Sequence, residues 1–167
     1  MRFLGRAGSP QVATAVLTAV SAAYMTLVAF GNITDYGTNR AFVEHVFAMD
    51  TTFRSPDLMW RAITSQSLVT AAYVLIIAWE SLTAVILLAA VVSWLRGHPT
   101  ARPLSSTGWV LQAVLFGLGF LAIGGEWFAM WQSKTWNGLT PAFQNTTLAT
   151  LGLILLHASK PSPQLAP

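Results

Sequence analysis

The stretch LIIAWESLTAVILLAAVV, from Leu75 to Val92, decides the fold class. It belongs to an apolar run between Leu68 and Leu95 in which Glu80 is the only charged residue. A helix needs about 20 predominantly apolar residues to cross the hydrocarbon core of a bilayer. The run therefore predicts a transmembrane helix that carries a carboxyl group inside the membrane.

The composition of the whole chain agrees with a membrane protein. The chain has 167 residues, of which 54% are hydrophobic and only 9% are charged. Soluble domains carry about 25% charged residues, so lipid must be part of the solvent of this chain. The nine lysines and arginines form no run interleaved with aromatic residues, which argues against nucleic acid as a partner. The absence of cysteine excludes disulfides, thiolate metal sites and cysteine nucleophiles.

Four segments are long and apolar enough to span, at about residues 11–30, 66–95, 108–131 and 142–158. We therefore expect an all-α integral membrane protein with four transmembrane helices, forming a single domain over residues 1–167. Ser55-Pro56-Asp57 and Thr140-Pro141 are typical of helix starts. The first segment could instead be a cleaved signal peptide because Ala19 to Met25 contains small residues, although its apolar part is long for such a peptide.

The distribution of basic residues predicts the orientation. With four spans, one side of the membrane carries Arg2, Arg6, Arg96, Arg102 and Lys160, and the other carries Arg40, Arg54, Arg61 and Lys134. Cytoplasmic segments carry the excess of lysine and arginine. We expect both termini to be cytoplasmic and the loop of about residues 31–65 to be external.

The external loop contains a candidate amphipathic helix, TNRAFVEHVFAMD, from Thr38 to Asp50. Its apolar residues recur at helical spacing, which predicts a short helix on the membrane surface or across the mouth of the bundle. Glu44, His45 and Asp50 could be metal ligands, but their spacing matches no zinc pattern and a solvated helix face is the favoured interpretation.

A second external segment, GGEWFAMWQSKTWNG, runs from Gly124 to Gly138. Trp127, Trp131 and Trp136 are expected to form an aromatic belt at the membrane interface. We expect Glu126 to form a structural ion pair that ties the external loop to the bundle. Its candidate partners are Arg40, Arg54 and Arg61.

The two external segments carry a resemblance to a known family. GNITDYGTNRAFVEHVFAMDTTF, from Gly31 to Phe53, followed by GGEWFAMWQS and WNG, resembles the bacterial predicted small integral membrane proteins, domain of unknown function 2165. The resemblance covers nearly the whole chain. It implies a four-span protein of the bacterial inner membrane, and it implies no activity and no functional residue.

Glu80 is the main candidate for a functional group. Tyr73 and Thr83 share its helix face, and no lysine or arginine lies within the four predicted spans. Without a buried cation, burial favours the neutral acid, which could donate a hydrogen bond to a neighbouring helix or subunit. The alternative is a protonatable site on an ion, proton or substrate path. Candidate neighbours are hydroxyls and amides, namely Thr18, Ser21, Tyr24, Thr26, Gln112, Thr147 and Thr150.

Three functions compete on this evidence. Small residues on the spans, such as Ala19 and Gly119, favour a protein that works by assembly, as a homo-oligomer or as an accessory subunit of a larger membrane complex. The alternative is an oligomeric transporter or channel that uses Glu80. A haem held by His98 and His157 is the least favoured possibility. The chain has no phosphate loop, nucleophile elbow or metalloprotease motif, so we expect no enzyme and no cofactor.

Overall fold

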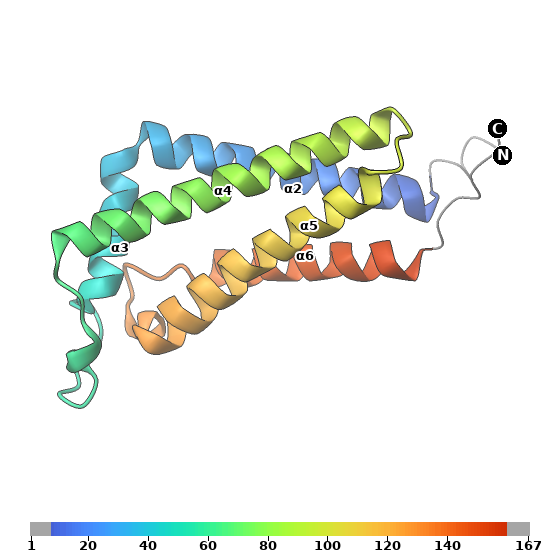
Figure 1. Ribbon diagram of the computed structural model, residues 1–167. Helices are drawn as coiled ribbons and strands as arrows, with labels where there is room; N and C mark the ends of the chain where they lie inside the picture. Colours follow the sequence, from blue (N-terminus) through green and yellow to red (C-terminus); the bar gives the residue numbers. More distant parts are fainter. Residues whose placement is uncertain (1–7, 160–167) are drawn as a thin grey trace.

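The computed structural model describes residues 8–159, and every regular element in this range is helical. The long helices are α2 (Pro10–Thr34), α4 (Gln66–Leu95), α5 (Ala101–Ala113) with its continuation η2 (Val114–Trp127), and α6 (Leu139–Ala158). They form four segments long and apolar enough to cross a membrane, and they lie alongside one another (Figure 1). The predicted all-α membrane fold with four spans is confirmed.

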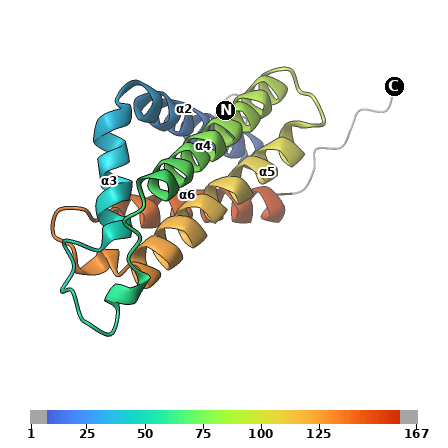
Figure 2. The ribbon, with the colours of Figure 1, turned by 60° about the vertical axis from the view of Figure 1, so that its left-hand side comes forward.

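A short helix, α3 (Tyr36–Ala48), lies across one end of the bundle (Figures 1 and 2). It follows α2 almost directly, because Asp35 ends one helix and precedes the other. Phe42, Val43, Val46 and Phe47 face the bundle, and Phe47 stacks on Phe128 with ring centroids 4.7 Å apart. The short helix predicted in this loop is confirmed, and its apolar face covers the ends of α4 and η2.

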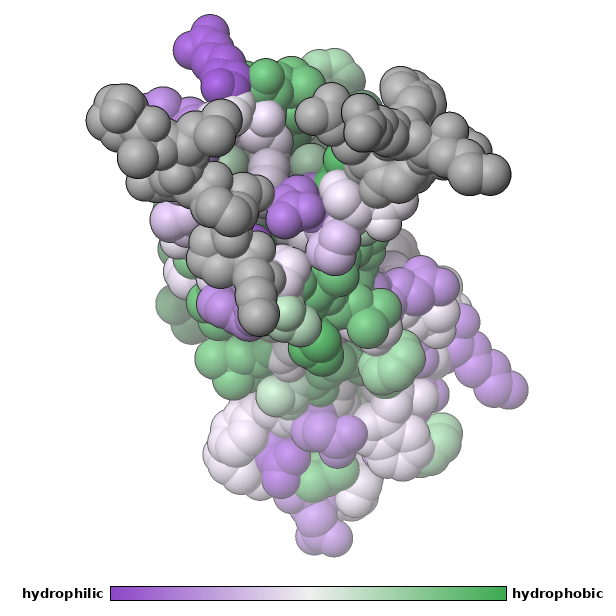
Figure 3. Space-filling view, turned by 90° about the vertical axis from the view of Figure 1, so that its right-hand side faces the viewer, coloured by the Kyte–Doolittle hydropathy of each residue, from purple (hydrophilic) through white to green (hydrophobic). Residues whose placement is uncertain are grey.

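The opposite end of the bundle carries the start of α2, the α4–α5 connection and the end of α6 (Figure 1). Figure 3 views this end, where hydrophilic side chains stand beside hydrophobic ones. Arg102, in the first turn of α5, donates to the carbonyl oxygens of Leu156 and Ser159 and to the Ser159 hydroxyl. It thereby caps the carboxyl end of α6. Three of the basic residues from which the orientation is predicted lie outside the described residues, namely Arg2, Arg6 and Lys160.

Two predicted helix starts are misplaced. Ser55 begins only a single turn, in which its carbonyl oxygen accepts from the amides of Leu58 and Met59. This turn leads into the short η1 helix (Met59–Arg61), and extended backbone at Ala62 then ends it. The helix of the second span therefore starts at Gln66, as its span boundary predicts. The last helix starts at Leu139, where the amide donates to the Asn137 side chain, one residue before Thr140.

The third span changes helix type along its length. From Val114 to Trp127 it is a π-helix, and the Phe128 amide donates to the carbonyl oxygen of Ile123, five residues earlier. Such helices are rare and usually last a single turn. The span begins at Ala101, seven residues before the predicted start, because Pro103 is tolerated in a first helical turn.

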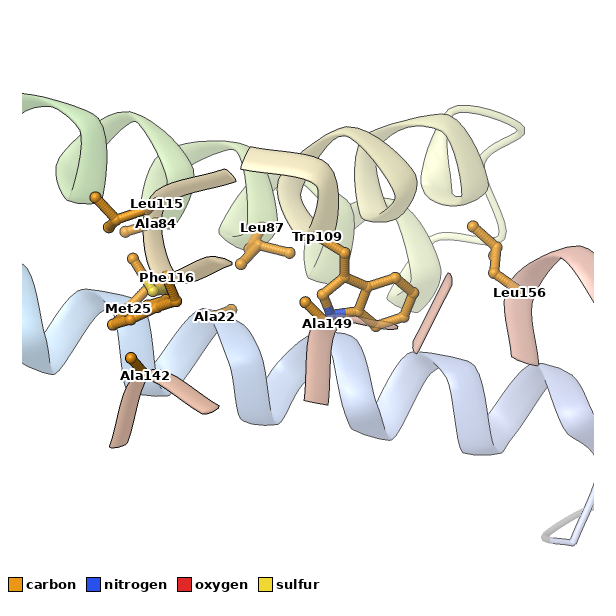
Figure 4. Close-up of a cluster of buried hydrophobic side chains, with 10 residues drawn as sticks. All are labelled: Ala22, Met25, Ala84, Leu87, Trp109, Leu115, Phe116, Ala142, Ala149 and Leu156. Carbon is orange, nitrogen blue, oxygen red and sulfur yellow. The ribbon is translucent and has the colours of Figure 1, made fainter. Parts of the chain in front are cut away.

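The core lies between the four spans and is centred on Trp109, which is completely buried (Figure 4). Ten buried side chains from all four spans form this cluster. Polar pairs cross it: the Trp109 indole donates to the Ser21 hydroxyl at 2.9 Å, and the Gln112 amide donates to Asn145 at 3.0 Å. Such bonds between helices replace the hydrophobic driving force that is lost in lipid.

Candidate functional site: a buried carboxyl group beside a cavity

Glu80 lies near the middle of α4 and is only 2% exposed. The Asn32 side-chain amide, in the last turn of α2, donates to Glu80 Oε2 at 2.7 Å. The other carboxyl oxygen, Oε1, has no hydrogen-bond partner within residues 8–159. One oxygen of a deeply buried carboxyl group is therefore fixed by the protein, and the other is available.

Tyr73 supports this arrangement from two turns away on α4. Its hydroxyl donates to the backbone carbonyl oxygen of Asn32 at 2.9 Å, and its ring packs against Tyr36 at 4.9 Å between centroids. The last four carbonyl groups of a helix lack partners within the helix, so this bond satisfies one of them. Tyr73 thus holds the end of α2 so that Asn32 can reach Glu80.

Thr83 does not join this group. Its side chain is buried, and its hydroxyl donates to the carbonyl oxygen of Trp79, one turn earlier on the same helix. The hydroxyl is therefore committed to its own helix, although residues three apart lie on neighbouring positions of a helix surface. The predicted trio of Tyr73, Glu80 and Thr83 is reduced to Tyr73 and Glu80.

A cavity of about 280 Å³ lies beside Glu80, between the spans and beneath α3. The described residues of its lining come from five helices and one loop. They include three asparagines, two tyrosines and one carboxyl group among apolar side chains, and none of them is a lysine, arginine or histidine. The lining residues are Tyr24, Val28, Asn32, Asn39, Phe42, Val43, Tyr73, Ile76, Glu80, Phe116, Phe120, Asn137, Gly138, Pro141 and Ala142. A carboxyl group inside a largely apolar cavity is suited to orienting a small ligand.

Sequence reasoning missed Asn32 because it ended the first span at Phe30. The helix continues to Thr34, and this additional turn places the amide at the depth of Glu80. Several predicted neighbours bond elsewhere, since Thr18 contacts Ser105 and Gln112 contacts Asn145. Gly31 and Asn32 are poor helix formers, so the sequence gives no strong signal for this additional turn.

A family model described as predicted small integral membrane protein, domain of unknown function 2165, matches residues 11–159. The chain belongs to this family. The match covers all four spans, the segment between α2 and α4, and the cavity. No curated protein and no solved structure matches the chain.

As expected for a small integral membrane protein, large apolar side chains cover the outside of the spans. Leu27, Leu75 and Val85 are each more than 60% exposed. No water-soluble protein of this size would present so many of them, and in a bilayer they contact the hydrocarbon chains of lipid.

The predicted ion pair of Glu126 is not formed within residues 8–159 of this small integral membrane protein. Arg40 instead pairs with Glu44 at 3.0 Å, one turn along α3, and also contacts Gln66. Arg61 lies over the rings of Trp60 and Trp127, at 5.5 and 4.9 Å from their centroids. Arg54 and Glu126 are both exposed. Two of the three arginines predicted to pair with Glu126, Arg40 and Arg61, therefore have other partners, and Arg54 is exposed.

Two of the three predicted belt tryptophans are exposed. Trp127 and Trp131 are 44% and 50% exposed, and each meets another exposed aromatic ring edge to face, Trp60 and Phe53 respectively. Trp136 instead lies under α3, stacked on His45 with centroids 4.5 Å apart. A belt at the membrane interface stays a prediction for Trp127 and Trp131, with Trp60 and Phe53 as members that the sequence did not reveal.

Two of the three histidines, His45 and His98, have hydrogen-bond partners in the protein. His45 Nδ1 lies 2.7 Å from a carboxyl oxygen of Asp50, whereas Glu44 contacts Arg40 and Gln66. Within the described residues, no group of three or more histidine, cysteine, aspartate or glutamate side chains could hold a metal ion. His98 Nδ1 contacts the Thr100 hydroxyl at 2.8 Å, in the connection between α4 and α5.

Proposed function

We propose that this protein acts through assembly in the bacterial inner membrane, as a homo-oligomer or as an accessory subunit of a larger complex, with both termini cytoplasmic. The observation that supports this proposal is an apolar groove between α4 and η2. It is suited to receiving a transmembrane helix of another subunit.

The groove consists of two adjoining hollows of about 190 and 200 Å³. They share five lining residues, Leu75, Ile76, Leu115, Gly119 and Ile123. A β-carbon at Gly119 would meet only the Leu115 side chain, at 3.9 Å, so the backbone there is open to the groove. Small residues at such positions let a second helix approach closely.

The mass and composition of the complex extracted from native membranes in a mild detergent test the proposal. A species built only of several copies of this chain indicates a homo-oligomer, and stoichiometric foreign subunits indicate an accessory protein. A Gly119→Leu variant fills the groove and should release the subunits. Ala89→Leu, a matched change at an exposed position of α4 outside the groove, should leave the complex intact. A monodisperse monomer without partners would overturn assembly.

The orientation can be tested directly because the chain has no cysteine. Asp57→Cys in the external loop and Thr100→Cys in the α4–α5 connection lie at opposite ends of the spans. A maleimide that does not cross membranes should label the first from outside whole cells and the second only after lysis. The reverse pattern would place the termini outside.

A second candidate function is transport or conduction that uses Glu80 as a protonatable site. The cavity beside this carboxyl group favours it, since acids within membranes face interiors or cavities and often serve there. Glu80→Gln should abolish a proton- or cation-dependent flux into vesicles while the protein still folds. A variant with wild-type flux at every pH tested would remove this candidate.

A further inference from the structure

We propose that the cavity beside Glu80 binds a small organic cation, a protonated or quaternary amine with a compact apolar body, whose charge pairs with the Glu80 carboxylate. The inference gives the ligand class for the second candidate function and rests on the same carboxyl group.

The charge of the cavity is the first argument. Glu80 is 2% exposed, and no basic residue lines the cavity with it. Asn32 fixes Oε2 as an acceptor, and Oε1 has no partner in the described part of the chain. Ionised carboxyl groups are costly to bury unless a cation or several hydrogen-bond donors compensate them. Without such compensation the buried carboxyl group takes up a proton, and a bound cation is the partner that would keep it ionised.

The aromatic walls are the second argument. Tyr24 and Phe116 meet edge to face with centroids 6.4 Å apart, and Phe116 packs against Phe120 at 5.6 Å. All three side chains line the cavity. Aromatic faces attract ammonium groups, and they do so more strongly away from water. They also accept the apolar substituents of an organic cation, which bulk water solvates poorly.

The single carboxylate of the cavity argues for an organic cation over a divalent metal ion. Calcium takes six to eight oxygen ligands and magnesium demands octahedral geometry. The side-chain oxygen of Asn137 already accepts from the Leu139 amide, whereas Asn32 and Asn39 bond through their nitrogen atoms and keep only neutral oxygens. Among the described residues of the lining, Glu80 is therefore the one charged ligand. The volume of about 280 Å³ limits the ligand to a compact one.

Binding is tested on the full chain in nanodiscs of phosphatidylglycerol, with tert-butylammonium chloride as the probe and tert-butanol as its neutral counterpart. Titration calorimetry should show saturable binding of one cation per chain and none of the alcohol. Glu80→Gln should weaken cation binding at least about tenfold, because one partner of a buried charge pair is lost. Glu44→Gln, which removes a carboxylate on α3 outside the cavity, should bind as the wild type does.

Val28→Phe provides an independent test, because it fills the cavity and leaves the carboxyl group in place. It should also lose binding, with an unchanged circular dichroism spectrum and elution profile. If Glu80→Gln fails to fold, this variant alone decides. Absence of saturable binding by the wild type, or equal binding by folded Glu80→Gln or Val28→Phe, would overturn the inference.

The same titration in nanodiscs that contain phosphatidylethanolamine separates two sources of the cation. Weaker apparent binding of the probe indicates that a lipid ammonium headgroup competes for the cavity, and unchanged binding indicates a free amine. Both results retain the cation site. Binding is measured without a gradient and is therefore independent of transport. If the protein binds the probe but carries no flux, only the proposed transport function is overturned. A flux that depends on Glu80 without binding of the probe overturns only the inference.

Discussion

The indole ring of Trp109 lies directly against the backbone of Gly152, where a β-carbon would come within 2.5 Å of ring atom Cε2. This contact joins α5 to α6 at the centre of the core. Both residues are buried, and the ring is also fixed by its bond to Ser21. The approach of the two helices therefore depends on the absence of a side chain at residue 152.

Gly152→Ala should lower the free energy of unfolding by about 1–3 kcal/mol, because overpacking in a filled core costs that much and the bonded indole cannot rotate away. Thermal unfolding of the purified protein in detergent measures the change. Gly31→Ala is the matched control, since a β-carbon there would meet nothing within 4 Å. It should be neutral or slightly stabilising, and equal melting temperatures for both variants would contradict the prediction.

The bond between Asn32 and Glu80 should contribute measurably to stability. Asn32→Ala removes the only side chain within residues 8–159 that donates to the buried carboxyl group. We expect a loss of about 1–3 kcal/mol, the cost of leaving a buried polar group unsatisfied. In a Glu80→Ala background the same change should cost far less. A double-mutant cycle by denaturant titration gives both values, and purely additive effects would show that the two side chains do not interact.

Arg102 should protect the end of α6. Arg102→Met keeps an unbranched side chain but removes the donors to Leu156 and Ser159. Hydrogen exchange in the last turn of α6 should become faster, while exchange in α4 stays the same. Arg96→Met is the control, because Arg96 is exposed and its side chain makes no hydrogen bond within residues 8–159. Exchange that is unchanged in Arg102→Met would refute the capping role.

Arg61 should hold the segment between α3 and α4 against η2 through its aromatic contacts. Arg61→Lys keeps the charge but loses the planar group that lies over Trp60 and Trp127. We expect a loss of about 0.5–1 kcal/mol and a shift in tryptophan emission. Arg54→Lys, at an exposed position, should change neither. Identical spectra for the two variants would contradict the contact.

The spans could be predicted because lipid imposes a simple rule on composition and length. The second span begins and ends at the predicted residues, Gln66 and Leu95, since its apolar run has no competing signal. The first span continues past its predicted end and the third begins before its predicted start, because residues such as Asn32 and Ser105 are polar and still lie in helices. The third span also ends at Trp127, before its predicted end at residue 131. The side chains of Asn32 and Ser105 form hydrogen bonds with other helices, and a hydropathy profile does not detect such partners.

The candidate site was predicted only in part for a related reason. Glu80 was conspicuous because an acid in an apolar run is rare, whereas its partner Asn32 lies where a loop was expected. The ion pair predicted for Glu126 is not formed within residues 8–159. The prediction assumed only that Glu126 and the arginines lie on the same side of the membrane. Arg40 pairs one turn away with Glu44, and Arg61 lies over aromatic rings, at distances that only the folded chain defines.

The order of Asn32 and Glu80 along the chain has a consequence for membrane insertion. A chain is synthesised from its amino terminus, so α2 is complete before α4 leaves the ribosome. The amide that receives the carboxyl group is then already in the bilayer when the most hydrophobic span of the protein arrives with its single acid. The earlier helix therefore carries the hydrogen-bond donor for an acid that is synthesised after it.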